Sequence, residues 1–190
     1  MAFIETGFPG LLVFEPKIFS DERGYFFESF NSKTFEENGI TRNFVQDNQA
    51  FSSCGILRGL HYQLNPHAQA KLVRVMQGEV LDVVVDLREG SPTYGKQYSI
   101  LLSAENQRQL YVPRGFAHGY AVLSPTALFF YKCDNFYNKS AEGGIAYNDS
   151  ALNIDWKIPA DKIILSEKDK MNKPFSTAEK NFVFNADFPY

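Results

Sequence analysis

Short runs of β-branched and aromatic residues, each closed by turn residues, recur along most of this chain. We locate them at residues 10–18, 24–30, 43–51, 56–63, 70–76, 79–87, 97–103, 108–113, 117–123 and 127–134. Breaks such as Gly90-Ser91-Pro92 and Pro113-Arg114-Gly115 give the chain places to reverse. Many short strands at this spacing predict a β-sandwich or a β-barrel.

The run at residues 79–87 shows the alternation of a strand most clearly. Alternation puts four apolar side chains on one face: Leu81, Val83, Val85 and Leu87. It puts Asp82 and Asp86 on the other face. The composition agrees, because 18 Phe and 10 Tyr bring the aromatic share to 15% of 190 residues. We therefore expect a mainly β protein rather than a helical bundle.

Little regular structure is expected outside these strands. One short helix is predicted after Ser32, which suits the N-cap position, running through residues 34–37 to Gly39. After Trp156 we expect a loop or a short helix. No linker or repeat divides the chain, so we predict one domain over residues 1–190, with a core barrel at about 40–135, an N-terminal extension and a C-terminal appendage at about 150–190.

The charge and cysteine content narrow the class of protein. A formal net charge of -3 and a pI near 5.6 give no support for binding nucleic acid or an anionic membrane. No apolar run approaches the roughly 18 residues of a membrane span. Cys54 and Cys133 lack CxxC spacing, and the first residues show no basic leader followed by an apolar stretch. We expect a soluble, reduced, cytoplasmic protein.

Two of the three histidines stand in suggestive strings. His118 ends a Pro-x-Gly-x-x-His turn that delivers an imidazole onto a strand, and this string resembles the second motif of the cupin β-barrel superfamily. In the first cupin motif two histidines and a glutamate precede a glycine, and His61 takes the place of the first histidine. Gln63 and Lys71 take the places of the second histidine and the glutamate, upstream of Gly78.

These replacements affect the expected chemistry. A lysine ammonium in a metal's ligand shell would repel the cation, so we predict no catalytic metal. A fixed Lys71 cation would instead stabilise negative charge that develops on a substrate oxygen inside a water-poor barrel. This favours chemistry through an enolate.

Alternation also groups possible acid and base residues. His61 and Gln63 share one face of their strand, and Phe129, Tyr131 and Cys133 share one face of theirs. An imidazole base and a phenol acid on opposite sides of a pocket would remove a proton from one face of a carbon and return one to the other. A strand tyrosine is also a common packing residue, so the pattern alone leaves Tyr131 open.

Several cations lie near the expected strand ends. They are Arg23, Arg58, Lys71, Arg114 and Lys168. Taken separately, they are ordinary surface charges. If several of them converged at the barrel mouth they would suit a diphosphate, which arginine binds through paired hydrogen bonds and lysine as a point charge.

Six strings together resemble the family of dTDP-4-dehydrorhamnose 3,5-epimerases over nearly the whole chain. They are DERGYFFESF (21–30), FVQDNQAFS (44–52), GILRGLHYQ (55–63), KLVRVMQGEVLDVVVDLR (71–88), YVPRGFAHGY (111–120) and LSEKD (165–169). The resemblance implies a cupin-type jelly-roll barrel with N-terminal extension strands and short peripheral helices. It also implies a cofactor-free isomerase that inverts C3 and C5 of dTDP-4-dehydro-6-deoxy-D-glucose, giving dTDP-4-dehydro-L-rhamnose for polysaccharide synthesis.

The resemblance assigns roles to individual residues. It implies that His61 is the general base, that Asp169 orients and charges its imidazole, and that Tyr131 is the general acid. Lys71 matches the residue that stabilises the 4-oxo group as it becomes an enolate. A further set matches positions that contact the sugar or the nucleotide diphosphate: Arg23, Phe26, Glu28, Gln46, Asn48, Arg58, His118, Tyr137, Glu142 and Lys168. The resemblance also implies a homodimer whose N-terminal strands help to complete the partner's site.

Other functions stay open at this stage. A related dTDP-4-keto-sugar mono-epimerase or 3,4-ketoisomerase would share the barrel and the nucleotide contacts. A sugar-binding cupin without catalysis, or a metal-dependent cupin oxygenase, would share the fold alone.

Overall fold

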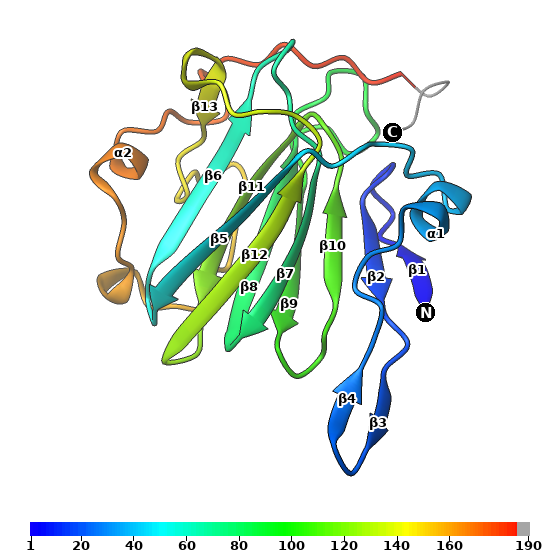
Figure 1. Ribbon diagram of the computed structural model, residues 1–190. Coiled ribbons are helices and arrows are strands. Elements are labelled where there is room, and N and C mark those ends of the chain that lie inside the picture. Colours follow the sequence, from blue (N-terminus) through cyan, green and yellow to red (C-terminus); the bar gives the residue numbers. More distant parts are fainter. Residues whose placement is uncertain (186–190) are drawn as a thin grey trace.

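The computed structural model describes residues 1–185 and consists of two antiparallel sheets packed against each other (Figure 1). The six-stranded sheet has the order β1 (Ala2–Glu5), β2 (Leu12–Glu15), β10 (Gln109–Val112), β7 (Lys71–Gln77), β12 (Thr126–Cys133), β5 (Gln46–Ser53). The five-stranded sheet has the order β13 (Glu142–Gly144), β6 (Leu57–Gln63), β11 (Phe116–Val122), β8 (Glu79–Asp86), β9 (Gln97–Ser103). A separate hairpin, β3 (Phe19–Asp21) with β4 (Gly24–Phe26), protrudes from the body.

Each of the runs predicted from the sequence contains one of these strands, which confirms the mainly β barrel. β1, β3 and β13 come in addition. The helical elements are short, as expected: α1 (Ser32–Glu37), α2 (Glu167–Lys170) and two 3-10 turns at Lys139–Ala141 and Ala160–Lys162. Within residues 1–185, no helix has the length and apolar character needed to cross a membrane.

The predicted N-cap of α1 was wrong by one residue. The side chain of Asn31, not of Ser32, accepts the backbone N–H groups of Lys33 and Thr34. Asn31 has extended backbone geometry, and its amide oxygen reaches two of the donors that have no partner within the helix. The predicted end was correct, because Gly39 follows the C-cap with φ of 84°.

Both faces of β8 are buried, which explains its apolar character. Leu81 and Val83 pack outward beneath the C-terminal segment, and Val84 packs inward between the two sheets. Asp82 shares the inward face and is fully buried. The carboxylate that alternation places opposite the apolar row thus lies inside the barrel, not in solvent.

The two chain ends pack onto the outside of the barrel. C-terminal residues Trp156 and Phe182 are buried against the outer face of the five-stranded sheet. Phe35 of α1 packs with Phe14 and Leu72 on the outer face of the other sheet. Full burial of each such side chain contributes about 1.5–3 kcal/mol. Because the chain ends pack on both outer faces, the barrel interior, which is lined by side chains from both sheets, is where we expect a ligand-binding site.

Candidate active site

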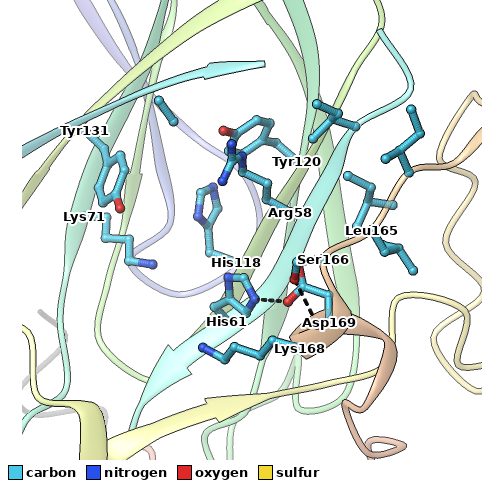
Figure 2. A pocket seen from close by; sticks show the side chains of 14 residues that line it. Arg58, His61, Lys71, His118, Tyr120, Tyr131, Leu165, Ser166, Lys168 and Asp169 are labelled. Atoms are coloured by element: carbon cyan, nitrogen blue, oxygen red, sulfur yellow. Dashed lines mark hydrogen bonds and ion pairs between the residues drawn. The ribbon is translucent and has the colours of Figure 1, made fainter. Parts of the chain in front are cut away.

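Two adjoining cavities of about 390 and 320 Å³ lie in the barrel and share three side chains, His61, Lys71 and Tyr131. β6 of the five-stranded sheet carries His61, whereas β7 and β12 of the six-stranded sheet carry the other two. Figure 2 shows His61 on one side of the hollow, with Tyr131 and Lys71 across from it. The barrel therefore brings together the imidazole, the phenol and the amine that the sequence singles out.

His61 is paired with the carboxylate that the family resemblance implies. Its Nε2 lies 2.5 Å from Oδ1 of Asp169. Ser166 caps α2 by accepting the backbone N–H of Asp169 at 3.1 Å, which fixes the start of that helix. Burial alone would raise the pKa of Asp169, but its hydrogen bond with His61 helps to hold the pKa below its usual value. An ionised Asp169 holds Nε2 protonated and leaves Nδ1 to accept a proton.

Tyr131 remains a proton donor over a wide pH range. Burial raises the pKa of its hydroxyl to about 12. The Nζ atom of Lys71 lies 5.8 Å from the centre of the Tyr131 ring. The phenol is therefore neutral at physiological pH and stands beside an amine.

The surroundings of Lys71 act on the charge of its amine in two opposite ways. Burial lowers the pKa of its ammonium group, and the nearby Cys133, Asp82 and Glu142 oppose that shift without cancelling it. A negative charge that forms on a bound molecule beside Lys71 acts in the same direction as these three groups and favours the charged form of the amine. The amine is suited to stabilise charge that appears only during a reaction.

His118 lines the larger cavity and forms a second histidine–carboxylate pair. Its Nε2 lies 2.9 and 3.0 Å from the two carboxylate oxygens of Asp82. Its ring stacks on Phe129, with the ring centres 6.0 Å apart. Asp82 was not among the predicted site residues, although a carboxylate within the apolar run 79–87 was the signal that could have identified it.

The smaller cavity is lined by a connected set of polar side chains. Nε2 of Gln46 donates to Oδ1 of Asn48 at 3.0 Å, and the hydroxyl of Tyr137 donates to Oε2 of Glu142 at 3.1 Å. The ammonium of Lys168 pairs with the other oxygen of Glu142. Burial would raise the pKa of Glu142, but its contacts with Lys168 lower it overall. The backbone N–H of Tyr137 also donates to Oε1 of Gln46 at 3.3 Å, so that contacts link β5, the loop after β12, β13 and α2 around one opening.

The predicted cations converge only in part. Arg58, Lys71 and Lys168 line the larger cavity. Arg114 instead donates from Nε to Oδ2 of Asp134 at 2.9 Å, and lines neither cavity. Arg23 pairs with Asp21 on the protruding hairpin. Three positive charges thus face the hollow from three different elements.

Three predicted substrate contacts, Arg23, Phe26 and Glu28, line neither cavity of their own chain. Phe26 is 70% exposed at the end of the hairpin, and Glu28 is also exposed. By contrast, Ser166, Tyr120 and the apolar residues Ile56, Leu57, Ile164 and Leu165 line the larger cavity without having been predicted. Nothing in the local sequence pattern places residues 164–166 beside β6.

Within residues 1–185, no three His, Cys, Asp or Glu side chains are grouped so that they could hold a metal ion. Lys71, which the cupin resemblance places at a ligand position, carries an amine that would repel a cation, and Gln63 donates from Nε2 to the backbone oxygen of His67 at 2.9 Å. The expectation of a reaction without metal or cofactor rests on these two side chains and stays a prediction.

Comparison with known proteins gives a consistent result. A family model described as dTDP-4-dehydrorhamnose 3,5-epimerase matches residues 5–177. The protein of that name from Shigella flexneri is 54% identical over 180 residues, which is 94% of this chain and 98% of the relative. The crystal structure of the Elizabethkingia anophelis dTDP-4-dehydrorhamnose 3,5-epimerase is 58% identical, with a TM-score of 0.90, covering 93% of this chain and 97% of that one. A crystal structure of the Legionella pneumophila dTDP-6-deoxy-D-glucose-3,5-epimerase, in complex with dTDP-4-keto-L-rhamnose, is 47% identical with a TM-score of 0.93. The match covers 97% of this chain and 99% of that one.

Proposed function

The chain belongs to the dTDP-4-dehydrorhamnose 3,5-epimerase family, and from this we propose how its own residues carry out the reaction. It is an isomerase that inverts C3 and C5 of dTDP-4-dehydro-6-deoxy-D-glucose to give dTDP-4-dehydro-L-rhamnose, in the biosynthesis of dTDP-L-rhamnose. The assignment of individual residues rests above all on one observation. His61, which is paired with Asp169, and the protonated Tyr131 line the same two cavities from opposite sheets.

The 4-keto group makes the hydrogens on both C3 and C5 acidic. In our scheme Nδ1 of His61 takes the proton from one of these carbons, and the electron pair moves onto the C4 oxygen to form an enolate. Lys71 stabilises that oxygen. Tyr131 then gives its proton to the opposite face of the same carbon. His61 returns its proton to solvent and Tyr131 regains one, so both groups are reset for the second carbon.

The nucleotide part of the substrate has its own proposed contacts. Arg58 and Lys168 bring positive charge to the cavity rim, where they would bind the diphosphate. The ring of Tyr137 is 55% exposed beside the smaller cavity and offers a flat surface to the thymine or the sugar. Gln46 and Asn48, together with His118 and Glu142, supply hydrogen-bonding groups to the sugar.

We infer a homodimer in which each protruding hairpin completes the partner's site. Arg23 and Phe26 do not contribute to the cavities of their own chain, yet Figure 1 shows their hairpin projecting away from the body. Phe26 is exposed at the hairpin, and Phe51 and Met76 are exposed on the six-stranded sheet. Exposed apolar surface of this kind is typical of association.

We also infer that the enzyme works in the cytoplasm. Both cysteines are free thiols, with Cys54 exposed and Cys133 buried. An exposed free thiol fits a reducing compartment.

The test of the residue roles is proton NMR of dTDP-4-dehydro-6-deoxyglucose in deuterated water, with no metal or cofactor added. Wild-type protein is expected to exchange hydrogen at C3 and C5 and to form the L-sugar. H61N is expected to slow both exchanges by about a hundredfold or more, the scale of a lost general base. H67N serves as the matched control, because His67 contacts Asn138 and lines neither cavity. Wild-type inversion at one carbon only, or normal exchange in H61N, would contradict the scheme.

A further inference from the structure

Arg58 differs from Lys168, the other cation at the cavity rim, in the way it is held. Within residues 1–185 it forms no ion pair with a carboxylate, whereas Lys168 is paired with Glu142. Its one side-chain hydrogen bond runs from Nε to the hydroxyl oxygen of Ser52, at 3.1 Å. This contact uses the inner nitrogen of the guanidinium and leaves both terminal nitrogens available.

The local fold explains why Ser52 and Arg58 meet. β5 ends at Ser53, the backbone N–H of Ile56 donates back to the oxygen of Ser53 at 3.2 Å, and β6 begins at Leu57. This tight turn carries the chain from one sheet to the other. Ser52, the last but one residue of β5, and Arg58, the second residue of β6, therefore face each other across the turn. Ser52 is only 3% exposed, so its hydroxyl is a fixed point.

A second buried hydroxyl lies next to the same guanidinium. Tyr120 is the direct partner of Arg58 in the pairing of β11 with β6. Its oxygen is buried and has no hydrogen bond of good geometry within residues 1–185. Burial raises the pKa of this hydroxyl, and the nearby Arg58 and Ser52 act against that shift, which places all three groups together. The ring stacks on Phe129 with centres 4.1 Å apart, and Figure 2 shows it beside Arg58 at the cavity.

We infer that Ser52 is a positioning residue for substrate binding: its hydroxyl holds Nε of Arg58, next to Tyr120, so that both terminal nitrogens meet the diphosphate. The inference rests on the proposed function, since the ligand is the diphosphate of the nucleotide sugar. A free arginine side chain loses rotamer freedom when it binds an anion. Ser52 removes part of that freedom before the ligand arrives, so the paired geometry that guanidinium and phosphate prefer is already present.

The first experiment measures dTDP binding by calorimetry and turnover by NMR in S52A and S52T. S52A is expected to raise the Kd for dTDP and the KM for the sugar nucleotide about five- to tenfold, the scale of one typical hydrogen bond, and to change kcat less than twofold. S52T restores the hydroxyl and is expected to restore affinity. Ser53 is exposed and next in sequence, so S53A is the matched control.

A double-mutant cycle separates positioning from a general structural effect. R58A is expected to weaken dTDP binding by itself, and adding S52A to R58A should cost nothing further, because Ser52 acts through Arg58. Y120F keeps the ring packed on Phe129 and is expected to weaken dTDP binding in the same direction as S52A. Thermal unfolding of each variant verifies that the fold is intact.

The outcomes are distinguishable. If S52A binds dTDP as wild type does, or if its loss adds in full to that of R58A, the inference is wrong while the proposed function stands. If the wild-type protein itself neither binds dTDP nor converts the keto sugar, the proposed function fails and this inference fails with it. A drop in kcat without a change in KM would also overturn the positioning role.

Discussion

Tyr131 and Lys71 lie beside each other in the barrel, and burial moves their pKa values in opposite directions. The pKa of Tyr131 rises to about 12, whereas that of Lys71 falls from its usual 10.5. Both shifts favour the neutral form of the group. The resting site therefore contains an acid that keeps its proton, beside an amine whose charged form is stabilised when an enolate forms next to it.

Y131F is expected to keep hydrogen exchange at the substrate carbon and to lose inversion of that carbon. His61 and Asp169 remain in this variant, so the substrate should still exchange its C3 hydrogen with deuterated water, while the product of inversion falls by about a hundredfold or more. The measurement is proton NMR of exchange and of product formation in one sample. Y98F is the control, because Tyr98 packs on Phe8 away from the cavities. Normal inversion in Y131F would remove Tyr131 from the scheme.

K71M is expected to stabilise the protein while it lowers turnover. Because the folded-state pKa of Lys71 lies below 10.5, the unfolded chain binds more protons than the folded chain between that lowered value and pH 10.5. Wild-type stability therefore rises with pH across this window, and the cost of the buried amine is greatest at its lower end. K71M lacks that cost.

Thermal unfolding midpoints of wild type and K71M, measured from pH 6 to pH 10, test whether the stability gained in K71M falls as pH rises. The gain in K71M should be largest at low pH and shrink as pH rises. K96M provides the comparison at an exposed lysine, and no pH-dependent gain is expected there. A K71M protein that is less stable than wild type throughout would contradict the effect of burial.

Among the elements, α1 shows how a local cap supports distant packing. Its only buried residue, Phe35, packs with Phe14 and Leu72 on the six-stranded sheet. A helix of six residues is not stable alone. The cap and the sheet together hold it in place.

N31A is expected to lower the free energy of unfolding by about 1 kcal/mol, because two backbone N–H groups at the start of α1 lose their acceptor. S32A should change it by less than half of that value, since no side-chain cap is assigned to Ser32. Urea unfolding of both variants measures the difference. Equal losses in the two variants would mean that the cap is not at Asn31.

Alternation and turn residues were enough to predict the long strands and the facing positions of His61 and Tyr131. The strands that were missed lack such patterns. β13 consists of Glu142, Gly143 and Gly144, and becomes a strand because it pairs with β6. The partner of His61 could not be found by spacing, because Asp169 lies 108 residues away on a four-residue helix. The sequence carries no local signal for contacts of that kind.

At the scale of the whole molecule, the projecting hairpin lies apart from the barrel cavities of its own chain, although residues of both are proposed to bind the substrate. Arg23 and Phe26 lie on β3–β4, whereas His61 lies inside the barrel. A site shared between two chains would bring these groups together in a symmetric pair.

Mixing two inactive variants tests this arrangement. One variant is H61N and the other is the double variant R23A/F26A. If hairpins are exchanged, a mixed dimer contains one complete site, made of the barrel of the second variant and the hairpin of the first. Unfolding and refolding the two together should recover about a quarter of the wild-type activity, since half of the dimers are mixed and each has one working site.

Light scattering on the same samples is expected to give the dimer mass. H61N mixed with wild type is the control for simple dilution. No recovery above the sum of the separate variants, or a monomer mass, would contradict the shared site.

The C-terminal segment that packs on the five-stranded sheet also sets when His61 gains its carboxylate partner during synthesis of the chain. His61 leaves the ribosome early, but Asp169 follows more than a hundred residues later. A growing chain therefore carries an imidazole without its carboxylate until the last segment has docked. The only tryptophan, Trp156, lies in that segment, buried and hydrogen-bonded to the backbone oxygen of Tyr147 at 2.8 Å. Its fluorescence should therefore report, in a newly made chain, the docking of the segment that brings Asp169 to His61.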